Sequence, residues 1–346
     1  TKAQVAPGTK TALVIDPLID GVSGAQSVAT RNMGIRLAEM VRKSYPQFEV
    51  QPFNRTTVAN NPVVLVGTFT AVNNAGDPKG DRDAYRICLA LADLKSGKII
   101  SKGVARANPQ GINVTPTTYY RDSPAWAKDL MTETYIKTCQ ATALGAALDK
   151  FYTDRIQVAA VVSDAINLYN DGRYAQSLAL YNAAAAAQGG DQMRVYTGQF
   201  LANWKLGRKQ AAAEAFAKIV DNGLANDKLN IKFLFRPGTA AYVADRKING
   251  PYPLWIKQLA QRAEAKNACL EVVGHTSKSG PEPVNQRLSL IRASVIAERL
   301  MQESKALGNR IIANGVGSRE ALIGTGRDDA SDALDRRVEF KTIKCT

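Results

Sequence analysis

Four cysteines and one histidine are the side chains best suited to bind a metal or attack a substrate. The cysteines are widely spaced and form no C-x-x-C pair: Cys88, Cys139, Cys269 and Cys345. Because His275 is the only histidine, a cysteine–histidine zinc site is not expected. An even number of cysteines at this spacing predicts two disulfide bonds in an oxidising compartment, with three pairings open. Four buried thiols are the alternative.

The sequence contains no recognisable arrangement for catalysis. Nothing marks an acid partner or an oxyanion hole for a triad with His275. The segment 315–318 lacks the third glycine of a dinucleotide-binding loop, and Ser96-Gly97-Lys98 is followed by Ile99 where a phosphate loop needs serine or threonine. We therefore expect a protein that is not an enzyme and that uses neither a cofactor nor a metal.

Length and charge limit the class of protein. A chain of 346 residues predicts two or three domains. The net charge of +14 favours acidic partners such as an anionic wall polymer or lipid, but the lysines and arginines form no concentrated stripe, so we expect no nucleic-acid binding. No apolar run approaches the roughly 18–20 residues that span a bilayer. The polar start, TKAQVAPGTK, is typical of a mature end after removal of a targeting segment or anchor.

Residues 1–152 are expected to form an α/β domain. Apolar or β-branched runs predict strands at 12–18, 48–53 and 62–72, and a hairpin around Lys95-Ser96-Gly97. The order of elements and the run ALVIDPLID resemble the small α/β domains of bacterial envelope lipoproteins.

A helix is expected after Ser123-Pro124, which supply a capping side chain and a first-turn proline. This helix would carry Trp126, Leu130, Cys139 and Leu144. A disulfide bond between Cys88 and Cys139 would then attach the helix to the strand that holds Cys88.

Residues 153–228 contain an internal repeat. The segment 165–184 aligns with 200–219 at an offset of 35, so that Gly172 matches Gly207 and Tyr181 matches Phe216. These segments resemble two tetratricopeptide repeats, helix–turn–helix units with a period of 34. A pair of ordinary helical hairpins is the alternative. Two copies are fewer than the three needed for an independent array, so we expect them to pack on a neighbouring domain.

Residues 229–346 are expected to form a second α/β domain. Strands are predicted at 232–240, 268–276, 310–318 and 336–344, and helices at 253–266 and 285–301. The fold class is therefore multidomain α/β plus α.

Ordered motifs in this last part resemble the OmpA-like peptidoglycan-binding family over roughly 115 residues. The matching positions are Gly274-His275-Thr276, Asn285, Leu288-Ser289, Arg292-Ala293, Gly315, Gly317 and the run 336–339. The resemblance implies a βαβαββ domain. It also implies a ligand, the diaminopimelate side chain of the wall peptide, which presents an ammonium and a carboxylate.

The resemblance assigns the carboxylate to Arg292, whose planar guanidinium suits bidentate pairing. Asn285 lies two helical turns before it, on the same face. The candidate peptidoglycan-binding residues are Thr276, Ser277, Asn285, Arg292 and Arg336. One departure is decisive, because Ser277 stands where the family has the aspartate that meets the ammonium.

Loss of that aspartate predicts diaminopimelate binding weaker by roughly one to two decades. Lys278 would repel an ammonium if it faced the site, and Glu282 is the nearby acid that could substitute. The family fold also places the last strand antiparallel to the strand at Cys269, which implies a second disulfide bond, Cys269–Cys345.

The sequence thus predicts a non-enzymatic scaffold or tether in the periplasm of a Gram-negative bacterium, associated with the outer membrane. Its C-terminal domain would contact peptidoglycan, the repeats would bind envelope proteins, and the precursor would carry a lipid anchor. The alternative is a protein-interaction subunit of an envelope or secretion assembly, in which the C-terminal domain has lost the wall ligand.

Overall fold

In a computed structural model of the chain, the described residues are 10–79, 82–125, 128–227, 229–322, 326 and 330–345. They fall into two compact units. Unit 1 comprises residues 1–76, 82–121 and 127–202, and unit 2 comprises residues 77–81, 122–126 and 203–346. The division passes through a helix of the predicted repeat region, so the boundaries at 152 and 228 stay predictions.

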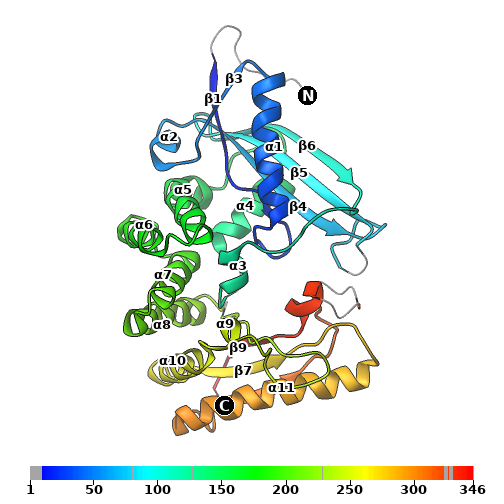
Figure 1. Ribbon diagram of the computed structural model, residues 1–346, viewed down its shortest axis with the longest axis vertical. Coiled ribbons are helices and arrows are strands. Elements are labelled where there is room, and N and C mark those ends of the chain that lie inside the picture. Colours follow the sequence, from blue (N-terminus) through cyan, green and yellow to red (C-terminus); the bar gives the residue numbers. More distant parts are fainter. Residues whose placement is uncertain are drawn as a thin grey trace. The chain divides into compact units, whose positions relative to one another are not determined.

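Unit 1 is built on one mixed sheet in the order β3-β1-β4-β5-β6 (Figure 1). Its strands are β1 (Thr11–Ile15), β2 (Ile19–Asp20), β3 (Phe48–Gln51), β4 (Val63–Val72), β5 (Ala84–Asp93) and β6 (Lys98–Ala107). β1 runs parallel to β3 and β4, whereas β5 and β6 add on as an antiparallel hairpin. All ten residues of β4 are buried, as expected of a strand covered on both faces.

Helices cover both faces of this sheet. They are α1 (Val28–Ser44), α2 (Arg55–Ala59), α4 (Leu130–Gln140) and α5 (Lys150–Asn170), and the short helix α3 (Thr118–Asp122) precedes α4 in the chain. Since side chains alternate along a strand, Leu13 packs in the cluster with residues of α1, and Val14 packs in the opposite cluster with α4 and α5. A capping box between Ser27 and Thr30 fixes the start of α1.

A disulfide bond joins Cys88 on β5 to Cys139 on α4, which confirms the first predicted pairing. The helix start at Ser123 was wrong. Ser123 Oγ donates a hydrogen bond to the Ala125 carbonyl oxygen instead, and α4 begins after Asp129, which accepts a hydrogen bond from the Thr132 N–H. The helix ends at Gln140, so the exposed Leu144 lies beyond it, and Trp126 lies outside the described residues.

The central region forms helices, as predicted. After α5 come α6 (Tyr174–Ala186), α7 (Met193–Lys205) and α8 (Lys209–Ala225). The turns between α5 and α6 and between α7 and α8 contain Gly172 and Gly207, both with positive φ (77° and 74°). A Cβ on Gly198 would overlap the ring of Tyr181, so this glycine lets α7 approach the aromatic closely. The tetratricopeptide identity of these helices remains a proposal.

Unit 2 contains a three-stranded mixed sheet in the order β8-β7-β9. β7 (Cys269–Gly274) is parallel to β8 (Ile311–Gly315) and antiparallel to β9 (Val338–Ile343). The helices α9 (Arg246–Asn249), α10 (Tyr252–Ala265) and α11 (Glu282–Glu303) and the short 3-10 turns η1 (Lys305–Leu307) and η2 (Ala330–Asp335) complete it. The predicted helices and the three later strands are present.

The strand predicted at 232–240 is not formed, and the described chain makes only isolated bridges at Ile231 and Phe235. Pro237 offers no N–H to a ladder, and Gly238 turns the chain with a φ of 66°. The apolar side chains of this segment pack in an aromatic cluster instead, in which the ring centroid of Phe233 lies 5.0 Å from that of Tyr252.

A second disulfide bond joins Cys269 and Cys345, which confirms the other predicted pairing. It follows from the register, because Cys269 lies opposite Ile343 at the end of the antiparallel β7–β9 pair.

Candidate functional site

A pocket of about 430 Å³ opens on unit 2 between α11 and the loop that follows β7. All five candidate residues line it: Thr276, Ser277, Asn285, Arg292 and Arg336. The structure therefore brings together residues that are up to 60 positions apart in the sequence. A volume in this range is typical of small-ligand sites.

Two glycines set the distance between the sheet and the helix that form the pocket. A Cβ on Gly274, at the end of β7, would collide with the carbonyl oxygen of Ser289 on α11. A Cβ on Gly315, at the end of β8, would meet the backbone of Leu290. Since no other residue fits at this separation, α11 lies directly on the strand ends and carries Asn285 and Arg292 to the loop 276–280.

Arg292 is fully buried and holds the pocket wall together. Its Nε donates to the Thr239 carbonyl oxygen (2.9 Å), Nη1 to His275 (3.1 Å) and Nη2 to Arg236 (3.1 Å). Each nitrogen of the guanidinium thus binds a backbone oxygen, and two segments distant in sequence are joined to α11. This arginine shapes the site, in addition to lining it.

The loop offers small polar groups at the position of the missing aspartate. Ser277 Oγ lies 3.1 Å from Ser279 Oγ, and Asn285 Nδ2 donates to the Gly280 carbonyl oxygen (3.3 Å). Among the described residues, the buried hydroxyl of Thr276 has no hydrogen-bond partner.

The two charged neighbours of the loop lie elsewhere. Lys278 is exposed and is not among the residues lining the pocket. Glu282 accepts hydrogen bonds from the backbone N–H and hydroxyl of Ser318 and lies 3.7 Å from Arg319. The suggested replacement of the family aspartate by Glu282 was therefore wrong, because this carboxylate is engaged at the turn after β8.

The charges in the described lining are all positive. Arg287, Arg292 and Arg336 line the pocket, and no described aspartate or glutamate does. Such a lining favours a carboxylate and gives an ammonium no countercharge. Apolar side chains complete the rim: Val284, Leu288 and Ile291. Sequence reasoning missed Arg287 and this rim. The i, i+4, i+7 spacing of Val284, Leu288 and Ile291 on α11 was the available signal for the rim.

His275 stands behind the pocket and is structural. It is fully buried, and its Nε2 lies 3.5 Å from Glu339. Burial lowers the pKa of His275. For Glu339, burial acts to raise the pKa, but the hydrogen bond with His275 and the charge of Arg337 outweigh it and lower the pKa to about 2. This buried network ties β9 to the loop after β7.

Membrane-spanning helices and metal-ligand clusters are both absent from the described residues. None of the described helices is long and apolar enough to cross a membrane. No group of three or more potential metal ligands occurs in the described part of the chain.

Comparison with known proteins identifies the domain that carries this pocket. Residues 254–333 match the model of the OmpA family, so the C-terminal third of the chain contains an OmpA family domain.

Curated relatives match about a quarter of the chain. The outer membrane protein Omp38 of two Acinetobacter baumannii strains is 32% identical over 97 residues, which is 28% of this chain. The chain spans 27% of the length of these relatives.

Solved structures resemble about a third of the chain. The C-terminal domain of Helicobacter pylori MotB is 20% identical over 33% of this chain and 84% of its own, with a TM-score of 0.27. The peptidoglycan-associated lipoprotein of Burkholderia pseudomallei is 19% identical over 32% of this chain and 89% of its own, with a TM-score of 0.28.

Proposed function

We propose that this protein is a non-enzymatic scaffold or tether of the cell envelope whose OmpA family domain contacts peptidoglycan. One observation carries the proposal: the five residues expected to bind the wall peptide line a single pocket of that domain. The predicted location, the periplasm at the outer membrane, agrees with the names of the Omp38 relatives.

The pocket favours one end of a diaminopimelate group. Its arginines would attract the carboxylate, and the loop hydroxyls and Asn285 would orient it. The ammonium would meet Ser277, a neutral side chain, so we expect weaker binding than in a site with an aspartate there.

The other parts of the protein would bind partners. Helices α5–α8 would present surfaces to envelope proteins in the manner of tetratricopeptide repeats, and a lipid anchor on the precursor would hold the protein at the outer membrane. The first proposal rests on the repeat pattern and on the helical structure of this region. The second comes from the resemblance to envelope lipoproteins alone.

A second function is favoured by the same lining. Because Ser277 replaces the carboxylate and Glu282 bonds Ser318, the domain could serve only as a docking module of an envelope or secretion assembly. In that case the pocket would no longer take the wall peptide.

Co-sedimentation with purified sacculi separates the two functions. We expect the chain to pellet with sacculi, and Arg287→Glu to weaken binding at least tenfold because it reverses a charge in the pocket lining. Lys257→Glu on α10 is the matched control, since it makes the same charge change at an exposed residue outside the pocket. Absence of pelleting, or equal loss in both variants, would reject wall binding through this pocket.

A further inference from the structure

Unit 1 contains a second pocket, at the carboxyl end of β1. Asp16 directly follows this strand, and its backbone N–H donates to the Leu65 carbonyl oxygen of β4 (3.0 Å). The chain leaves β1 to form β3 on one side, whereas β4 pairs on the other side. Ligands of open α/β sheets bind beyond the carboxyl ends of strands at such a change of direction.

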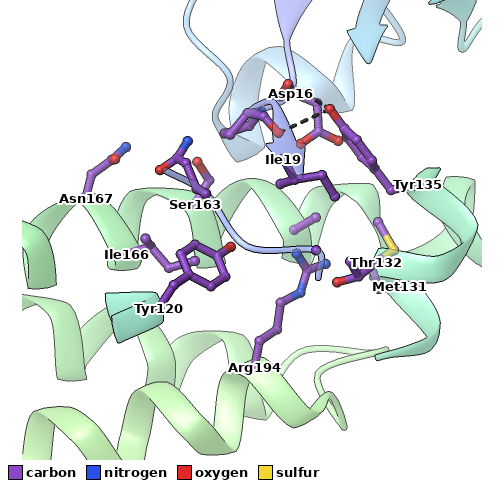
Figure 2. A pocket seen from close by; sticks show the side chains of 14 residues that line it. Asp16, Ile19, Tyr120, Met131, Thr132, Tyr135, Ser163, Ile166, Asn167 and Arg194 are labelled. Carbon is purple, nitrogen blue, oxygen red and sulfur yellow. Dashed lines mark hydrogen bonds between the residues drawn. The ribbon is translucent and has the colours of Figure 1, made fainter. Parts of the chain in front are cut away.

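Two opposite charges face this pocket. Figure 2 shows Asp16 above the enclosed space and Arg194, from α7, below it. Asp16 is 7% exposed, and its Oδ2 accepts a hydrogen bond from the Tyr152 hydroxyl (2.8 Å).

Arg194 keeps unused donor capacity. Its Nε donates to Gln192 Oε1 (3.2 Å) and lies 3.8 Å from Asp129 Oδ2. Its Nη2 is buried without a hydrogen-bond partner among the described residues. Buried donors are nearly always paired in native proteins, so an unpaired guanidinium nitrogen beside a pocket points to an anionic ligand group.

The remaining lining fits a compact ligand. Neutral polar side chains from several elements surround the space: Gln26, Tyr120, Ser163 and Asn167. Its volume of about 40 Å³ corresponds to roughly three or four water-sized groups, at about 10–15 Å³ each, so only the smallest ligands fit. Nucleotides, sugars and peptides are therefore too large.

We propose that this pocket binds glycine, the smallest free α-amino acid, with its carboxylate on Arg194 and its ammonium on Asp16. The ligand ammonium would lie beside Asp16, and the ligand carboxylate would accept a hydrogen bond from Nη2 of Arg194, whose Nε already lies 3.8 Å from Asp129 Oδ2. No covalent step is involved. The site is separate from the pocket of unit 2 and does not depend on wall binding.

The ionisation of Asp16 agrees with this assignment. Burial raises the pKa of Asp16 to about 7, against the opposing effects of the Tyr152 hydrogen bond and the Arg194 charge. Tyr152, Tyr135 and Tyr120 lie near it, and burial raises the pKa of each, so they stay neutral. Asp129 lies beside Arg194. A ligand ammonium would favour the charged form of Asp16, and binding should strengthen as the pH rises through 7.

The test uses the full-length chain and three probes at pH 8: glycine, acetate and methylamine. Ligand-observed NMR or calorimetry should show saturable glycine binding, at least tenfold tighter than either single-charge probe. Asp16→Asn and Arg194→Gln should each weaken glycine binding about ten- to a hundredfold, since each removes a charge-assisted hydrogen bond.

Asp154→Asn is the matched control, because this carboxylate lies exposed on α5 and pairs with Lys150. It should leave glycine binding unchanged. Undetectable glycine binding, or acetate binding as tight as glycine, would overturn the proposal. These two outcomes are read on the unmodified protein, so they decide the question even if a variant fails to fold.

Discussion

Replacement of Arg292 by methionine should destabilise unit 2 strongly. Methionine keeps much of the side-chain volume but leaves three carbonyl oxygens, those of Arg236, Thr239 and His275, without these donors. Each unsatisfied buried acceptor costs about 1–3 kcal/mol. Because the pocket admits water to part of this region, we expect the lower part of the summed range, about 3–5 kcal/mol.

Urea unfolding monitored by tryptophan fluorescence measures this change. Trp255 is buried in unit 2, 5.6 Å from the ring of Phe216, and its emission should follow loss of that packing. With a slope of about 2 kcal/mol per molar urea, the midpoint should fall by roughly 1.5–2.5 M.

Arg287→Met is the matched control, because Arg287 lies on the same helix, lines the same pocket and is exposed. Its substitution should change the free energy of unfolding by less than about 0.5 kcal/mol. Equal urea midpoints for Arg292→Met and Arg287→Met would show that the three carbonyl contacts of Arg292 contribute nothing to the stability of unit 2.

Three further outcomes are expected. Ser277→Asp should tighten sacculus binding about ten- to a hundredfold, because it restores a countercharge for the ammonium; unchanged affinity would contradict this. Glu339 has a folded pKa of about 2, below its usual 4.5, so its contribution of about 3 kcal/mol is present above pH 4.5 and lost as the pH falls toward 2. Glu339→Gln should remove that part of the pH dependence in urea unfolding. Gly274→Ala should lower the free energy of unfolding by about 1–3 kcal/mol, because the added methyl group would collide with the carbonyl oxygen of Ser289. Urea unfolding followed by circular dichroism measures this change.

The sequence grouped the five candidate residues of unit 2 because local pattern and ordered motifs agree there, and these residues line one pocket. Their binding of the wall peptide stays a prediction. The apolar spacing of α11 placed Asn285 and Arg292 on one face, and the structure explains the motif glycines through the close approach of Gly274 and Gly315 to this helix. The sequence did not predict the structural role of Arg292. Its partners, the carbonyl oxygens of Arg236 and Thr239, lie in a segment that was predicted as a strand.

The remaining errors have physical causes. Ser123-Pro124 has the composition of a helix start, but the chain begins α4 only at Leu130 because Asp129 supplies the cap. The pocket of unit 1 was not predicted, since Asp16 and Arg194 are far apart in sequence and belong to no local pattern. Only the tertiary arrangement of β1, α4, α5 and α7 brings them together.

Binding of the wall peptide in the pocket of unit 2 can be measured by an NMR titration of the isotope-labelled chain with a soluble muropeptide that ends in diaminopimelate. We expect saturable shifts of the backbone amides of Thr276, Ser277 and Asn285, and larger shifts in Ser277→Asp at equal ligand concentration. Shifts confined to other parts of the chain, or no shifts at millimolar ligand, would contradict it.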